Sequence, residues 1–221
     1  MKLLLLKDLY TQKISVYFLS LLWFILFTNF FTSGEPVRHV ILISIVAFFL
    51  TMSTNGEQNS TFEKESVLIN SLPCTRKQVV LSKYLSGFMW FAISAVTGII
   101  YIFLFDMFAP FPTRMIHLNE LLIALCGTFI LLAIFYPLLF KTNYFIASIL
   151  TFIIPFIVII GIQMIANMME NPNTAFIYDY ISIITANQNL ITTVFASVSV
   201  LFVLISFNIS VRIYRNKDLH A

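Results

Sequence analysis

Long apolar runs separated by short polar breaks dominate the chain. About 20 mostly apolar residues are needed to cross the roughly 30 Å hydrocarbon core of a bilayer. Six runs meet that length within a few residues: Ile14–Phe31, Val37–Thr54, Leu85–Phe108, Leu118–Phe140, Tyr144–Met168 and Leu190–Val211. Breaks such as Pro110 to Pro112 carry stop signals, because proline cannot continue a helix. The pattern predicts an all-α, polytopic membrane protein with six transmembrane helices in a single domain, residues 1–221.

The composition fits a chain surrounded by membrane lipid. Hydrophobic residues make up 59% of it and charged residues only 10%, whereas soluble domains carry about 25% charged residues. The two cysteines, Cys74 and Cys126, form no spacing typical of a disulfide framework or a metal site. We therefore expect no metal, no nucleic-acid partner and a surface that faces lipid.

The positions of lysine and arginine predict the orientation. With the N-terminus inside, only Arg38 and Arg114 fall in outer segments. Eleven others fall in inner segments: Lys2, Lys7, Lys13, Lys64, Arg76, Lys77, Lys83, Lys141, Arg212, Arg215 and Lys217. Loops rich in Lys and Arg stay in the cytoplasm, so we expect both termini there. Residues 1–13 are expected to form an interfacial helix, and residues 169–189 an extracellular segment.

The predicted spans lack the groups that active transport or catalysis within one chain would need. No Asp, Glu, Lys or Arg lies near the middle of a span, where ion-coupled transporters place ionisable groups. No G-x-x-x-x-G-K-[ST] loop is present, so the chain has no phosphate-binding loop of that kind. We predict no catalytic residue, and that ATP, if used, is bound by another polypeptide.

Uncharged polar residues within the spans are candidates for lining a pathway. They are Asn29, Thr97, Gln163, Asn167 and Asn208. The alternative, which we favour, is that such residues hydrogen-bond between helices and hold the bundle together. Gly98 and Gly161 are expected to mark close approaches of helices.

The segment 55–84 is the one long inner loop and is expected to contain two short helices. The first is broken at Leu72 and Pro73. The second begins at Thr75, where Gln78 three residues later predicts a capping box, and it continues into the third span. This basic helix could also pair with anionic lipid headgroups.

Residues 70–84, NSLPCTRKQVVLSKY, resemble the signature SLP-x-[ST]-R-x-x-[IV]-V-x-[SA]-K-Y of ABC-2 type permeases, the membrane subunits of one class of ATP-binding-cassette exporter. The resemblance implies the type V exporter-like bundle with an N-terminal interfacial helix. It also implies a coupling helix in the inner loop that docks on an ATPase. The coupling residues implied are Phe62, Glu63, Glu65, Leu68, Leu72, Pro73, Arg76 and Lys77.

The resemblance further implies an ABC ATPase subunit that binds ATP and Mg, and a second permease, identical or related, in the plasma membrane of a bacterium. This short form is most similar to permeases of Gram-positive peptide exporters, such as the staphylococcal systems for phenol-soluble modulins. We therefore expect export of an amphipathic peptide or a lipophilic cargo. The alternative is a non-transporting scaffold or sensor that recruits a cytoplasmic partner.

Overall fold

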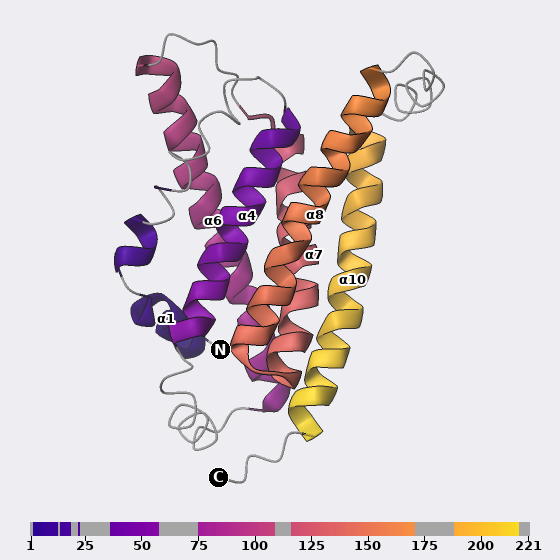
Figure 1. The fold of residues 1–221 in the computed structure, drawn as a ribbon. Coiled ribbons are helices and arrows are strands. Elements are labelled where there is room, and N and C mark those ends of the chain that lie inside the picture. The colour runs from indigo at the N-terminus through magenta and orange to yellow at the C-terminus, as the bar shows by residue number, and fades with distance from the viewer. Residues whose placement is uncertain are drawn as a thin grey trace.

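The computed structural model describes residues 2–12, 14–18, 22, 36–57, 75–108, 116–170 and 188–216, and every element with bounds in these ranges is an α-helix. The long helices stand side by side as a bundle (Figure 1): α4 (Pro36–Glu57), α6 (Arg76–Phe108), α7 (Leu118–Lys141), α8 (Tyr144–Glu170) and α10 (Gln188–Asn216). The short helix α1 (Lys2–Thr11) lies beside one end of it. That end also carries residues 75–84 and the last turns of α10, and we call it the motif end.

The helices cover five of the six apolar runs. The remaining run, Ile14–Phe31, lies largely outside the described residues, although residues 14–18 are helical. Among the described residues, α6, α7 and α10 are long and apolar enough to cross a membrane, and α4 and α8 contain shorter apolar stretches, His39–Asn55 and Tyr144–Pro155. The membrane character is therefore evident, and the count of six spans stays a prediction.

One helix, α6, is longer than the span expected within it. It has 33 residues, which corresponds to about 50 Å at 1.5 Å per residue. The second half of the inner loop, from residue 76 to residue 84, is therefore the first part of this same uninterrupted helix. A change in the position of these turns acts directly on the rest of α6.

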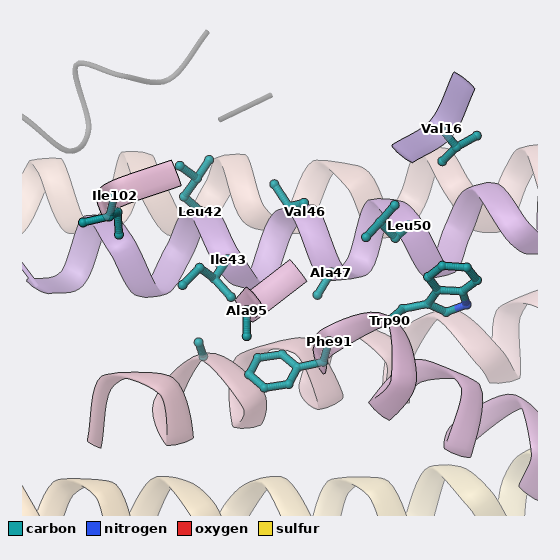
Figure 2. Close-up of a cluster of buried hydrophobic side chains, with 11 residues drawn as sticks. Val16, Leu42, Ile43, Val46, Ala47, Leu50, Trp90, Phe91, Ala95 and Ile102 are labelled. Carbon is teal, nitrogen blue, oxygen red and sulfur yellow. The ribbon is translucent and has the colours of Figure 1, made fainter. Parts of the chain in front are cut away.

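A hydrophobic core joins α4 to α6. In Figure 2, Ile43 and Ala47 of α4 face Phe91 and Ala95 of α6, and Trp90 is fully buried near Leu50. A second core at the motif end contains Phe48, whose ring meets the edge of Phe135 at a centroid distance of 5.6 Å and an interplanar angle of 88°. The two cores stack α4 against both α6 and α7.

Serine hydroxyl groups add hydrogen bonds between these helices. Ser94 of α6 donates to the carbonyl of Ile43 at 3.0 Å. The Ser44 hydroxyl of α4 is shared between the carbonyl of Ala124 in α7, at 2.9 Å, and that of Val40 in its own helix, at 2.8 Å. Because lipid chains are as apolar as leucine, such bonds help to fix which helices associate in a membrane.

The helices approach closely at glycines that differ from the expected ones. A Cβ atom at Gly87 would lie 2.4 Å from Leu132 Cδ1, and one at Gly127 would lie 3.1 Å from Ser44 Oγ. Gly98 is buried in α6, whereas at Gly161 no described atom lies within 4 Å of the position that a Cβ would take, so the expected close approach there stays a prediction. Close packing of α6 on α7 and of α7 on α4 therefore depends on Gly87 and Gly127.

Candidate functional site

The first turn of α6 begins with the predicted capping box. The backbone N–H of Thr75 donates to Oε1 of Gln78 at 3.0 Å, and the N–H of Gln78 is 3.4 Å from Thr75 Oγ1. These contacts satisfy two N–H groups that the start of a helix leaves without partners. The prediction of a capping box at Thr75 is thus confirmed, and α6 has a defined start three residues after Pro73.

Arg76 joins this first turn to the end of α10. Its Nη1 donates to the carbonyl of Tyr214 at 3.3 Å and to the carbonyl of Arg215. The last carbonyls of a helix lack helical donors and carry partial negative charge, so a guanidinium group there satisfies them and complements the helix dipole. Arg76 and Lys77 are both exposed. The hydrogen bonds of Arg76 nevertheless join the first turn of α6 to the last turn of α10.

Lys83 joins α6 to α1. Its Nζ lies 3.2 Å from Asp8 Oδ1, and the two side chains are only 12% and 4% exposed. Burial and the nearby Lys83 charge lower the pKa of Lys7, the residue before Asp8, to about 8 from its ordinary 10.5, while Asp8 opposes that shift. Gln12, just after α1, donates from Nε2 to Ser53 Oγ of α4 at 2.7 Å. Polar contacts thus fasten α1 to both α6 and α4.

Tyr84 joins α6 to α10. Its hydroxyl oxygen lies 2.6 Å from Ser206 Oγ and 3.4 Å from Ser210 Oγ, and all three residues are buried. One residue earlier, the carbonyl of Lys83 accepts a hydrogen bond from the Tyr136 hydroxyl of α7 at 2.6 Å. The rings of Tyr84 and Tyr136 also pack together, with centroids 4.7 Å apart. Residues 83 and 84 therefore connect α6 to three other helices.

Most of the expected coupling residues lie outside the described residues. These are Phe62, Glu63, Glu65, Leu68, Leu72 and Pro73. The last of them, Pro73, is separated from Thr75 only by Cys74, so a displacement of these residues would be transmitted to the first turn of α6 through the chain.

The expected pathway residues do not form one group among the described side chains. Thr97 donates to the carbonyls of Ile93 and Ser94 in its own helix, each at 3.0 Å. The exposed Asn208 donates to the carbonyl of Leu204 at 2.9 Å, also within its helix. Asn29 lies outside the described residues, as do the side chains of Gln163 and Asn167 in α8.

An apolar cavity of about 360 Å³ lies instead between α4, α7, α8 and α10. Side chains from all four helices line it, including Ile45, Ile130, Pro155 and Phe195, and Ser44 supplies a hydroxyl group. A site of this kind accepts hydrocarbon and not an ion, because it offers almost nothing to replace lost hydration. This cavity was not predicted from the sequence.

The interhelical contacts of Asp8, Lys83, Tyr84 and Ser206 were not predicted from the sequence either. One signal was available: Ser199, Ser206 and Ser210 recur at steps of seven and four residues, which places them on one face of the last helix. All three are buried. Which helix packs against these three serines depends on the order of helices in the bundle. That order cannot be predicted from the sequence around the serines.

The chain was compared with known families, curated proteins and solved structures. A family model described as ABC-2 family transporter protein matches residues 3–215. No curated protein and no solved structure matches the chain significantly. The match spans almost all of the 221 residues, including the motif end. Members of this family are the non-catalytic, membrane-embedded components of ABC transporters, and the ATPase is a partner subunit. The chain therefore belongs to the ABC-2 family of transporter proteins, as a multi-pass membrane protein.

Proposed function

We propose that this chain is the permease subunit of an ATP-binding-cassette exporter that a separate ATPase drives from the motif end. The observation that carries the proposal is the arrangement of the signature residues at the start of α6. Arg76 contacts α10, Lys83 contacts α1, and Tyr84 contacts α10. A displacement of the preceding segment would therefore act on several helices at once.

The ATPase is proposed to dock on residues Phe62 to Leu72, with Glu63, Glu65 and Leu68 in the contact and Arg76 and Lys77 beside it. ATP and Mg are bound by that partner and not by this chain. In support, the first turn of α6 is capped, and Arg76 bonds it to α10. The segment before it would therefore push on a rigid element. The orientation that follows has the motif end in the cytoplasm of a bacterium, with both chain termini on that side of the plasma membrane.

A single bundle of this size leaves little room for a bulky cargo. We therefore propose that a second permease, identical or related, completes the route. An amphipathic peptide or a lipophilic molecule is the proposed cargo, as in staphylococcal exporters of phenol-soluble modulins. The apolar cavity of about 360 Å³ supports this class of cargo, because its lining would bind hydrocarbon and would not stabilise a small hydrophilic ion.

The proposal is tested by disrupting the docking segment. Reversing Glu63 or Glu65 to Lys, or replacing Leu68 with Trp, should abolish both co-purification with the ATPase and permease-stimulated ATP turnover. The matched control is Asp106→Lys, which reverses a charge at the opposite end of α6 and should leave both intact. If all three docking variants retain both properties, the docking assignment is wrong. ATPase recruitment without any cargo movement would favour the scaffold function.

A further inference from the structure

A proline inside α7 leaves one carbonyl of that helix without its helical donor. Pro137 has no backbone N–H, so the carbonyl of Ala133, four residues earlier, cannot make the usual intrahelical bond. A backbone carbonyl without a partner is costly in an apolar environment. Here Ser206 of α10 supplies the donor, and its hydroxyl lies 2.5 Å from the Ala133 carbonyl oxygen.

The direction of the neighbouring hydrogen bond follows from this one. Because Ser206 uses its single hydroxyl proton on Ala133, its oxygen can only accept from the Tyr84 hydroxyl 2.6 Å away. The chain of donors therefore runs from Tyr84 of α6 through Ser206 of α10 to the Ala133 carbonyl of α7. We call these three groups the Tyr84 relay. It joins three helices at one buried point.

A second serine of α10 makes a similar bond with a different consequence. Ser199 donates to the carbonyl of Cys126 in α7 at 3.2 Å. The residue four positions later, Ile130, has an N–H and lies in the same uninterrupted helix, so this carbonyl already has a helical partner. Ser199 is thus an internal control for Ser206, with the same donor, helix pair and acceptor type.

The relay is also a second attachment of α10 to α6. Arg76 holds the carbonyls of Tyr214 and Arg215, and Tyr84 holds Ser206 about 12 Å further along the axis at 1.5 Å per residue. A helix held at one point can pivot, whereas a helix held at two points keeps its position and tilt. In lipid the hydrophobic effect does not drive helices together, so polar contacts such as these act together with close packing to set the helix register.

We propose that Tyr84 and Ser206 are positioning residues that make α10 follow α6 when the ATPase displaces the motif end. Pro137 leaves the Ala133 carbonyl of α7 without a helical donor. The hydrogen bond from Ser206 to this carbonyl keeps the Ser206 oxygen oriented to accept a hydrogen bond from Tyr84. This inference rests on the proposed function, because it supposes that the motif end moves. The geometry beneath it can be tested without that supposition.

The first experiment tests the geometry by thermal unfolding of the purified permease in detergent. Ser206→Ala should lower the Tm by about 4 °C, clearly more than Ser199→Ala does. Pro137→Ala restores an N–H at position 137 that can donate to the Ala133 carbonyl. In that background Ser206→Ala should therefore lower the Tm much less. The Tyr84 relay would be overturned if Ser206→Ala and Ser199→Ala lowered the Tm equally. It would also be overturned if Ser206→Ala lowered the Tm as much in the Pro137→Ala background as in the parent. Tyr84→Phe, which keeps the ring and removes the donor, provides an independent variant.

The second experiment tests movement in the complex with its ATPase, in a background without native cysteines. Spin labels at Arg212 of α10 and Ile146 of α8, both exposed, report the distance between these helices with and without trapped ATP. The parent and Ser199→Ala should show the same ATP-dependent shift, and Tyr84→Phe and Ser206→Ala should lose at least half of it.

The two possible failures are distinguishable. If the relay variants shift as the parent does, the positioning role is wrong and the proposed function stands. If the parent itself shows no shift, or no ATPase is recovered with it, the proposed function fails and the positioning role fails with it.

Discussion

Lys83 and Tyr84 are neighbours in the sequence, but their side chains serve different helices. On one side Lys83 pairs with Asp8 of α1, and on the other Tyr84 binds Ser206 of α10. Consecutive residues of a helix point about 100° apart, so one short stretch can contact two partners. The lysine and tyrosine of the family signature therefore have a structural explanation in this chain, as contacts that place α6 among its neighbours.

The close approach at Gly87 gives a prediction at this scale. Gly87→Ala places a Cβ atom 2.4 Å from Leu132 Cδ1. Leu132 is fully buried, so its side chain would have to shift within the packed core. We expect a loss of about 2 kcal/mol in the free energy of unfolding, measured by denaturation in detergent. Gly161→Ala is the control, because the described surroundings there are open, and an equal loss at both glycines would contradict the packing argument.

The lowered pKa of Lys7 gives a second prediction. In the folded chain the pKa is about 8, below the ordinary 10.5, so the unfolded state binds more protons between these two pH values. The stability of the folded state should therefore rise as the pH increases through this window. Lys7→Met removes this rise and should be more stable than the parent at pH 7. Parallel Tm profiles of the two proteins from pH 7 to pH 10 would contradict the assignment.

At the scale of elements, the sequence predicts helices well where local signals suffice. Apolar length locates α4, α7, α8 and α10 within a few residues, and Thr75 with Gln78 locates the start of α6. Contacts between helices were not predictable, because they depend on which faces meet. Pro137 did signal a free carbonyl, but nothing near it in the sequence indicates that a serine 69 positions later would supply the donor.

The attachment of α1 gives a prediction for an element. Asp8→Ala removes the carboxylate that pairs with the buried Lys83 ammonium group. Removing one partner of a buried ion pair typically lowers the free energy of unfolding by about 3 kcal/mol. We expect α1 to detach, so that limited trypsin digestion cleaves after Lys7 faster than in the parent. Combining Asp8→Leu with Lys83→Met removes both charges and should restore much of the protection. Unchanged cleavage in Asp8→Ala would show that the ion pair does not hold α1 in place.

At the scale of the whole molecule, several of the contacts that join separate helices lie at the motif end, in addition to those in the middle of the bundle and the Asn119–Asn189 contact between α7 and α10. At the motif end α1, α6, α7 and α10 are linked by Asp8, Lys83, Tyr84, Tyr136 and Arg76. The opposite end of α6 carries exposed apolar residues such as Met107 and Phe108. The contacts at the motif end suit a permease that receives its mechanical input there, as proposed above. The family match implies association with an ABC ATPase subunit.

The account depends on the motif end facing the cytoplasm, where an ATPase can reach it. Cys74, one residue before the capping residue Thr75, tests this directly in a Cys126→Ala background, which leaves it as the single cysteine of the chain. We expect no reaction of Cys74 with a membrane-impermeant thiol reagent in intact cells, and full labelling after the cells are permeabilised. Labelling of Cys74 in intact cells would place this end outside and would contradict the account.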